Sequence, residues 1–366
     1  MNEQNEIIST PVGGSAQPAP APQSKTHGSK RRSLKIAAAV ALLAVAAGVA
    51  WLAPYFMATA PQDAMLYLRR GSSIATVGDS LRAKTNDAFT ARVVKLLHVT
   101  HADLTGRHGA FKIEKGTSAW ALMRLLRSGP TTPVKVTFNN VRTKRDLARR
   151  VTAKLMISAD DLLAVLNDSA LVARYGMDTT TVVAMFLPDT YEFHWDISAQ
   201  DLVARFHDYY DKFWTPERQA QAKREGLTPL QVSVLASIVD EETAKADEKP
   251  LVARLYLNRL ARNIKLQADP TVKFALGDFA IRRITLAMLN VDSPYNTYRV
   301  AGLPPGPIRV PAKATLEAVL EAPQHDYIYM CAKEDFSGYH NFATTLAEHE
   351  ANARRYHQAL NERKIK

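Results

Sequence analysis

The chain contains 366 residues, of which 46% are hydrophobic and 23% charged, with 16 Gly, 19 Pro and a single cysteine, Cys331. This composition predicts two or three folding units with buried cores, and it excludes a disordered chain, a collagen and a disulfide-stapled mini-protein. The single cysteine also excludes an internal disulfide and a paired-cysteine zinc site. The net charge of +11 favours a polyanionic neighbour such as nucleic acid, anionic lipid or an acidic cell-wall polymer.

A membrane anchor is predicted near the N-terminus. Residues 1–35 are rich in Pro, Ser and Gln and end in a basic cluster, which predicts a disordered cytoplasmic tail. Residues 36–57 carry no charge, and a helix of that length can span a hydrocarbon core about 30 Å thick. The basic cluster keeps the N-terminus in the cytoplasm, so the rest of the chain lies outside the membrane, where nucleic acid is not expected.

Two other interpretations of this apolar segment stay open. It could be a buried core helix, although a chargeless run of this length behind a basic cluster is unusual in a soluble core. It could also be a cleaved signal peptide, because Ala58-Thr59-Ala60 resembles a cleavage site with small residues. The segment is longer than a typical signal core, which favours the anchor.

Residues 60–157 contain a loose internal repeat that predicts a small α/β module. Short alternating strands are expected at residues 65–70, 109–114 and 134–140. Each strand is followed by a helix with Ser or Thr near its start, and these segments begin at Gly71, Gly116 and Val141. An ordinary scaffold role for this region is the alternative to a binding module.

Residues 158–366 are expected to form a mixed α/β domain. Residues 158–226 are mostly helical in pattern and are interrupted by the turn-forming FLPDTYEF segment at 186–193. The last 140 residues or so contain most of the polar and aromatic side chains that could bind or react with a substrate. A polar, charged helix is predicted over residues 345–364.

A helix beginning at Pro229 carries the strongest catalytic candidate. Thr228 is a good N-cap and Gln231 can complete a capping box. At helical spacing, Glu242 continues the apolar stripe of Leu235, Ile238 and Val239, whereas Asp240 falls on the small, polar side and Glu241 flanks it. A carboxyl group among apolar side chains has a raised pKa, which suits a general acid near neutral pH. A structural Glu paired with Arg is the alternative.

Loops after this helix supply candidate sugar-binding side chains. They combine hydroxyl, amide and carboxylate groups with aromatic faces, which suit a carbohydrate ring, although such loops are also commonly structural. The candidates are Gln267, Asp269, Thr271, Tyr295, Asn296, Thr297, Tyr298 and His340. His340 and His349 could in principle bind a metal, but no metal-binding spacing accompanies them, so we expect no metal and no cofactor.

Several of these segments resemble the motifs of one family. ASIVDEET, LYLNRL, LQADPTV, YNTY, GLPPGPI and HNFATTLAEH are similar, in order and spacing, to motifs of the endolytic murein transglycosylases (MltG or YceG-like). The resemblance covers roughly residues 60–364. Within it, GSSIATVGDSL, GAFKIEKGTSAWALMRLLRSG and FLPDTYEF resemble a LysM-like region and its junction with the catalytic domain.

The resemblance implies an α+β protein with a single N-terminal transmembrane helix at 36–57, a LysM-like region at 60–157 and a transglycosylase domain at 158–366. The family's usual motif ASIVEKE ends in the catalytic Glu, which corresponds to Glu242, and an earlier family Glu is replaced by Asp240. Asn139-Asn140 stands where many relatives have a Glu-Gly turn.

The implied activity is that of a lyase in cell wall biogenesis at the inner membrane. It would cut the bond between N-acetylmuramic acid and N-acetylglucosamine in nascent glycan strands, leave 1,6-anhydro ends, and work with peptidoglycan synthases. Glu242 would act first as general acid and then as base. Two alternatives are a hydrolase that uses Glu242 with Asp269 as second carboxylate, and a non-catalytic, membrane-anchored peptidoglycan-binding scaffold.

Overall fold

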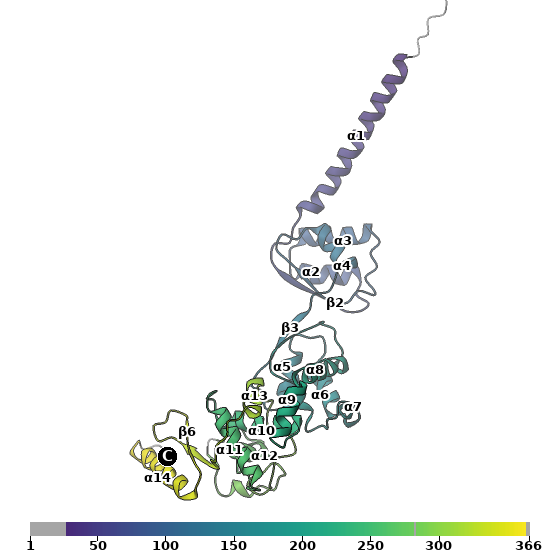
Figure 1. The fold of residues 1–366 in the computed structure, drawn as a ribbon. Helices are drawn as coiled ribbons and strands as arrows, with labels where there is room; N and C mark the ends of the chain where they lie inside the picture. The colour runs from purple at the N-terminus through teal and green to yellow at the C-terminus, as the bar shows by residue number, and fades with distance from the viewer. Residues whose placement is uncertain (1–26, 282, 364–366) are drawn as a thin grey trace, which may run out of the picture.

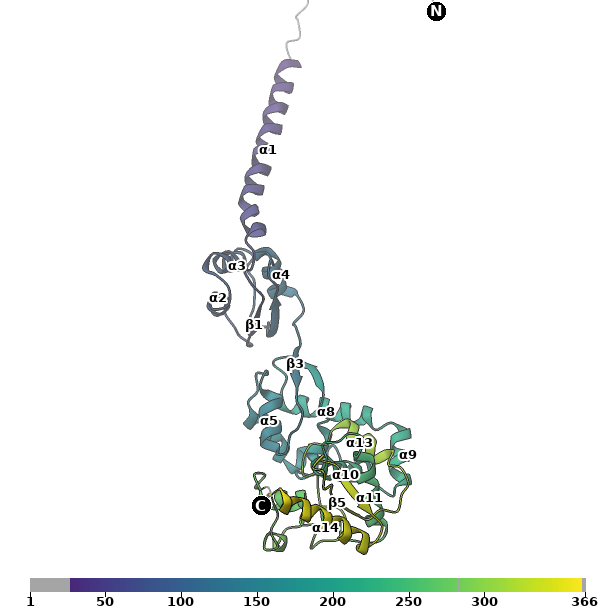
Figure 2. The same cartoon turned by 90° about the vertical axis from the view of Figure 1, so that its left-hand side faces the viewer.

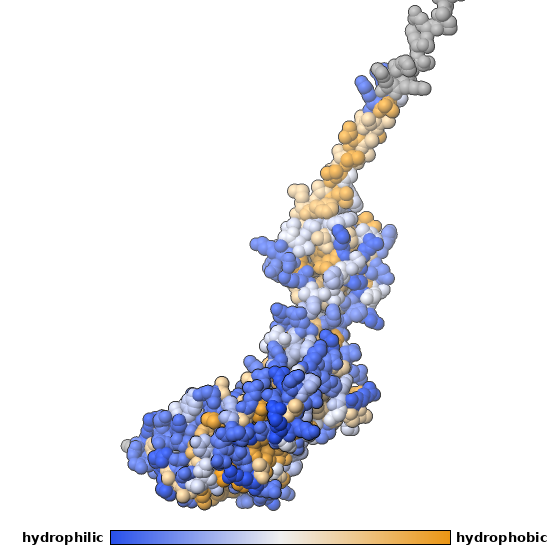
Figure 3. All heavy atoms as spheres, in the orientation of Figure 1, coloured by the Kyte–Doolittle hydropathy of each residue, from blue (hydrophilic) through white to orange (hydrophobic). Residues whose placement is uncertain are grey.

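The structure is a computed structural model that describes residues 27–281 and 283–363. A long helix, α1 (His27–Met57), projects from a small folded part, which is followed by a larger one (Figure 1). The prediction of one long apolar N-terminal helix is confirmed: the stretch Arg32–Met57 contains an 18-residue window with a mean hydropathy of 2.4, and no residue of that window is buried. Figure 3 shows the same helix as an apolar rod.

The helix begins earlier than the predicted span of residues 36–57. Residues 27–35 of the predicted tail are helical, because Lys and Arg favour helix and extend the hydrogen-bonded ladder before the apolar run. The remainder of that predicted tail, residues 1–26, lies outside the described residues.

The small part has the order β1 (Ala64–Leu68), α2 (Ile74–Arg82), α3 (Asp87–Val99), β2 (Gly109–Ile113) and α4 (Ala119–Ser128). β1 and β2 pair antiparallel with Leu66 opposite Phe111, and both side chains are fully buried. The predicted Ser caps are confirmed at two helix starts, where the side chains of Ser73 and Ser118 accept hydrogen bonds from Thr76 and Ala121 amides.

The end of α1 is built into this small part. Tyr55 is 5% exposed and belongs to its hydrophobic core. The Ala60 amide donates to the Thr117 carbonyl at 2.9 Å, and the Phe56 and Trp120 rings lie 5.5 Å apart. The C-terminal end of α1 is therefore packed against the small part, and Figure 2 shows α1 joining it at the end that holds α3 and α4.

The first half of the larger part surrounds a second two-stranded sheet. Its elements are β3 (Val134–Thr137), α5 (Lys144–Thr152), α6 (Ala159–Asn167), α7 (Ser169–Ala173), the 3-10 turn η1 (Val182–Met185), β4 (Thr190–Phe193), α8 (Ala199–Phe213) and α9 (Pro216–Arg224). β3 pairs antiparallel with β4, so that Val136 lies opposite Tyr191.

This pairing moves the boundary between the two cores. The core of the small part extends from Tyr55 to Leu126, and the side chains from Val134 onward pack in the core of the larger part. The change therefore lies before β3, earlier than the residue 157 boundary expected from the sequence. The repeated strand-then-helix pattern groups β3 with β1 and β2 in one module. It cannot show that β3 pairs with β4, which lies more than 50 residues later in the sequence.

The turn after β3 keeps a left-handed residue without glycine. Asn140 has φ of 46°, a conformation that Asn tolerates better than most residues, and its side-chain oxygen accepts from Arg309 Nη2 at 2.6 Å. The Asn139-Asn140 departure from the family pattern is thus accommodated.

The second half of the larger part contains α10 (Pro229–Glu242), α11 (Lys249–Ala261), α12 (Asp269–Leu276), the 3-10 turn η2 (Met288–Asn290) and α13 (Lys313–Leu320), followed by β5 (Tyr329–Ala332), β6 (His340–Ala343) and α14 (Leu346–Glu362). β5 and β6 form a hairpin beside α14. The described residues thus form a mixed α/β fold with three small antiparallel sheets, and the predicted polar C-terminal helix is confirmed.

Candidate active site

α10 places Glu242 at its last residue. The predicted capping box is confirmed: the Gln231 amide donates to Thr228 Oγ1, and the Thr228 amide donates to the Gln231 side chain. The helix ends because Thr243 is extended, with ψ of 136°. Glu242 therefore lies where the backbone leaves the core, and its side chain reaches a cavity.

The predicted division of α10 into an apolar and a polar face is wrong. Residues 232–239 are all buried, including Ser233 and Ser237, because other helices surround α10. Asp240 is not on a solvated side: its side chain is 3% exposed and accepts from Lys249 Nζ at 2.5 Å and from the Ala312 amide at 2.7 Å. Glu241 instead accepts from Arg142 and Arg309, at 2.8 and 2.9 Å.

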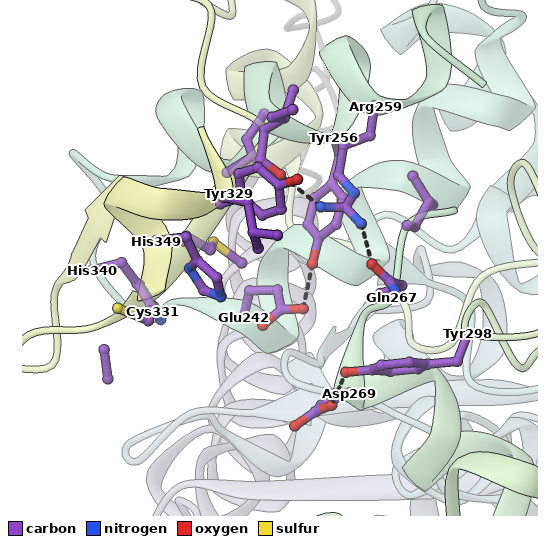
Figure 4. Close-up of a pocket in the computed structure, with 16 residues that line it drawn as sticks. Glu242, Tyr256, Arg259, Gln267, Asp269, Tyr298, Tyr329, Cys331, His340 and His349 are labelled. Atoms are coloured by element: carbon purple, nitrogen blue, oxygen red, sulfur yellow. Dashed lines mark hydrogen bonds between the residues drawn. The ribbon is translucent and has the colours of Figure 1, made fainter. Parts of the chain in front are cut away.

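Glu242 lines a cavity of about 480 Å³ between α11, the start of α12, the β5–β6 hairpin and α14 (Figure 4). The residues around it combine apolar, aromatic and polar side chains. They are Glu242, Leu255, Tyr256, Arg259, Leu266, Gln267, Asp269, Tyr298, Ile328, Tyr329, Met330, Cys331, Ala332, His340, Leu346 and His349.

The surroundings of Glu242 favour its protonated form. Burial raises its pKa to about 7, the Tyr256 hydrogen bond opposes this shift, and the negative charge of Asp269 adds to it. The Tyr256 hydroxyl donates to Glu242 Oε1 at 2.5 Å, and the Tyr256 side chain comes from α11 and is 2% exposed. Near neutral pH this carboxyl group can therefore both give and take a proton.

Asp269 lies across the cavity at the first residue of α12. Its Oδ1 accepts from the Tyr298 hydroxyl at 2.6 Å, and Figure 4 shows this pair on the other side of Glu242 from Tyr256. Burial and the neighbouring Asp269 raise the pKa of Tyr298, so its hydroxyl stays a donor at neutral pH. The site thus holds a second carboxylate, Asp269, and one of its two oxygens accepts the hydrogen bond from Tyr298.

Gln267 is held by a buried arginine. It has φ of 53°, and its side-chain oxygen accepts from Arg259 Nη2. Arg259 is 5% exposed and also donates to the carbonyls of Lys265 and Ile328, at 2.9 and 2.6 Å. Arg259 therefore ties the Gln267 turn to the start of β5.

The hairpin and α14 form the remaining wall. Glu248, 3% exposed, accepts from the His340 amide at 2.6 Å and pairs with His340 Nδ1 at 3.0 Å, which leaves Nε2 for the cavity. The His349 ring stacks on Tyr329 with 5.2 Å between centroids. Burial and the nearby Arg259 lower the pKa of His349, so it is neutral at pH 7.

The structure brings four of the predicted sugar-binding residues to the cavity beside Glu242: Gln267, Asp269, Tyr298 and His340. Four others do not line the cavity. These are Thr271, Tyr295, Asn296 and Thr297.

These four side chains serve internal contacts. Thr271, Asn296 and Thr297 are at most 1% exposed; Asn296 Nδ2 donates to the carbonyls of Leu289 and Val291, both at 2.8 Å. Thr297 Oγ1 accepts from the Ala268 amide at 3.0 Å, beside Thr271. Tyr295 packs on Phe274. They fix the loop that carries Gln267 and Asp269.

Tyr256, Arg259 and Tyr329 were missed as site residues. A partial signal existed in LYLNRL, because Tyr256 and Arg259 are three residues apart and share a helix face. Among the described residues no cluster of three or more His, Cys, Asp or Glu side chains could hold a metal ion.

The model of the YceG-like family matches residues 66–355 of the chain, and the chain belongs to that family. The chain is 26% identical to the endolytic murein transglycosylase of Bacillus subtilis over 80% of its own length and 84% of the relative's. It is 29% identical to the enzyme of that name from Streptococcus pneumoniae, over 49% of this chain and 32% of that protein.

A solved structure supports the same assignment. The crystal structure of a YceG-like protein from Listeria monocytogenes matches with a TM-score of 0.53 and 25% identity, over 79% of this chain and 98% of that one. The family predicted from the sequence is confirmed, and the enzyme class predicted, lytic transglycosylase, is the class that the relatives' names give.

Proposed function

We propose that the chain is an endolytic lytic transglycosylase that cuts the bond between N-acetylmuramic acid and N-acetylglucosamine in peptidoglycan glycan strands and leaves 1,6-anhydro ends. The observation that carries this proposal is Glu242: a carboxyl group in a large cavity, hydrogen-bonded to Tyr256, with a pKa of about 7. The relatives named endolytic murein transglycosylases support the substrate class.

The reaction needs one carboxyl group. Protonated Glu242 donates to the glycosidic oxygen while the bond from that oxygen to the muramic acid anomeric carbon breaks. The Glu242 carboxylate then takes the proton of the same sugar's C6 hydroxyl, whose oxygen attacks the anomeric carbon and closes the anhydro ring. Glu242 ends protonated and no water is consumed. A pKa near the working pH serves both steps.

The substrate contacts are assigned to the four predicted residues that line the cavity. Gln267 and His340 are each fixed by a buried charged side chain, Arg259 and Glu248 respectively, which leaves their outer polar atoms aimed at a ligand. Asp269 and Tyr298 offer a carboxylate oxygen and a phenol to sugar hydroxyls. This preorganised set suits a polar carbohydrate ring.

A two-carboxylate hydrolase remains the second candidate, and it rests on Asp269. This side chain lies near enough to Glu242 for its charge to raise the Glu242 pKa. In a hydrolase the second carboxylate would act as nucleophile or activate a water molecule. Its bond to Tyr298 favours an orienting role instead, because one oxygen is already an acceptor.

The small part is proposed to be a LysM-like peptidoglycan-binding module outside the inner membrane, held there by α1 with the N-terminus in the cytoplasm. The strand–helix–helix–strand order of β1, α2, α3 and β2 supports the module. Cleavage after Ala60 would remove Tyr55 from the small core and break three backbone hydrogen bonds, to residues 116, 117 and 119, which favours an uncleaved anchor. The resemblance to the family, and not the structure, implies peptidoglycan synthases as partners.

Mass analysis of products from purified, uncrosslinked glycan strands tests the activity. Anhydro ends are expected from the wild type; species heavier by one water would indicate the hydrolase, and uncut strands a scaffold. Glu242→Gln should lower the rate by about 100-fold or more, because the amide cannot carry a proton. Glu241→Gln, the neighbouring control, should keep most activity. A folded, active Glu242→Gln protein would refute the assignment.

Membrane fractionation tests the anchor separately. The full-length protein should remain in the membrane fraction after a high-salt wash, because the apolar span, and not surface charge, holds it. Release of a shortened protein beginning near residue 61 would show a cleaved signal.

A further inference from the structure

The face of the small part nearest the anchor carries a groove that the proposed reaction does not use. It lies between the end of α1 and one face of α3, made by Ala88, Ala91, Arg92 and Lys95, which we call the α3 face. These residues follow helical spacing and therefore lie on one side of α3. The groove has a volume of about 440 Å³ and adjoins a second hollow of about 410 Å³ near Met57.

This groove is apolar on one wall and basic on the other. The α1 wall consists of Ala50, Trp51, Pro54 and Tyr55, and Trp51 is 49% exposed. The α3 wall offers Arg92 and Lys95, and no carboxylate lines either hollow. Neither cation forms an ion pair with any residue in the described part of the chain; Arg92 Nη1 donates to the Ala88 carbonyl at 2.9 Å.

The position of the groove follows from the anchor. The apolar span ends at Met57, so Trp51 and Tyr55 lie at its outer end, where aromatic side chains meet lipid headgroups. Figures 1 and 2 both show α3 at the end of the small part that receives α1. Because Tyr55 is buried in the small core and Ala60 bonds to Thr117, α3 cannot swing away from this level.

The charge of the small part matches an anionic surface. Residues 58–133 contain eleven Lys and Arg against five Asp and Glu. A basic side chain beside an anionic leaflet is attracted to it at short range, within a Debye length of about 8 Å. The α3 face is basic and lines one groove with the outer end of the apolar helix, whereas Arg69 and Arg70 follow the far end of β1.

We infer that the α3 face rests on the outer leaflet of the membrane that holds α1 and binds anionic phospholipid headgroups in the α1–α3 groove. Arg92 and Lys95 contact the lipid phosphate, and the exposed Trp51 ring contacts the upper acyl chain. This inference rests on the membrane attachment in the proposed function. Its consequence is that the small part is held flat against the bilayer and does not tumble above it.

Hydrogen exchange of the full-length protein in nanodiscs tests the inference. α3 amides should exchange more slowly in discs of phosphatidylcholine with phosphatidylglycerol than in discs of phosphatidylcholine alone. The double variant Arg92→Gln/Lys95→Gln should lose up to about 25-fold of this protection, since each basic side chain at an anionic surface contributes roughly fivefold.

A matched control has the same loss of charge at the far end of the module. Arg69→Gln/Arg70→Gln, just after β1, should keep the lipid-dependent protection, because β1 leads away from the anchor end. Ala91→Glu, at an exposed site, should abolish it by repulsion without removing a contact from the core. Equal protection in both discs, or equal loss in the two double variants, would overturn the inference.

Failure of the inference and failure of the proposed function give different results. Glu242→Gln should keep the lipid-dependent protection although it makes no anhydro product. Arg92→Gln/Lys95→Gln should cut soluble glycan strands at the wild-type rate, because both residues lie outside the cavity. A protein that does not enter nanodiscs through α1 would refute the anchor itself.

Discussion

The raised pKa of Glu242 predicts that this residue lowers the stability of the folded protein as the pH rises. Folding raises the pKa from the ordinary value of 4.5 to about 7, so the folded state binds the proton more tightly than the unfolded state. Below about pH 4.5 the carboxyl is protonated in both states and carries no penalty. Between about 4.5 and about 7 the penalty grows, and above about 7 it is complete.

The size of this effect follows from the shift. A change of about 2.5 units at about 1.4 kcal/mol per unit gives a penalty of about 3 kcal/mol at alkaline pH. Glu242→Gln has no charge to desolvate and keeps an oxygen that can accept from Tyr256. The variant should therefore be more stable than the wild type by up to about 3 kcal/mol at about pH 8, with little difference at about pH 4.5.

Thermal unfolding of both proteins in detergent, across this pH range, measures the difference. For a folded part of this size we expect the melting temperature of the variant to exceed that of the wild type by roughly 6 to 12 °C at about pH 8. Glu321→Gln, at an exposed site, is the control and should change little. If the difference in melting temperature between Glu242→Gln and the wild type stayed constant with pH, burial would not be the main cause of the raised Glu242 pKa, and the reasoning would be refuted.

Three other predictions test the residues around Glu242. Tyr256→Phe removes the hydrogen bond that opposes the shift, so the Glu242 pKa should rise above about 7 and the alkaline limb of the rate–pH profile should move upward; an unmoved limb would contradict this role. Asp240→Asn should lower the free energy of unfolding by about 3–5 kcal/mol in urea titrations, because Lys249 loses its buried partner; a loss below about 1 kcal/mol would mean that the pair is not structural. Glu248→Gln should lower kcat because Glu248 holds His340 in place. The double variant with His340→Gln should then be no slower than the slower of the two single variants. Additive losses in the double variant would show that Glu248 and His340 act independently.

The parts of this site that the sequence could predict are local. The capping box of Thr228 and Gln231 sets the start of α10, and its regular length brings Glu242 to the end. The misplacement of Asp240 has a physical cause: a periodicity argument assumes that a helix has one buried face, whereas α10 is buried on all sides. Polar residues on such a helix are paired internally and are not solvated.

The remaining walls depend on contacts between distant segments. Asn296 and Thr297 had side chains suited to sugars, but only the fold shows that backbone carbonyls and amides use them. His349 reaches the cavity because α14 packs against the β5–β6 hairpin. The sequence of α14 has the polar pattern of a helix exposed to solvent. That pattern alone therefore does not show that His349 faces the cavity while the other polar side chains of α14 face water.

The hairpin and α14 complete a cavity whose acid lies much earlier in the chain. In the topology proposed above, with α1 as the anchor and the rest of the chain outside, Glu242 crosses the membrane before His340 and His349. Until those residues emerge, the cavity lacks a wall and the carboxyl group stays in contact with water, which keeps its pKa near the ordinary value. Under the proposed function, this order of export would delay activity until the domain is complete, and a partly translocated chain would not cut the wall around its own exit site.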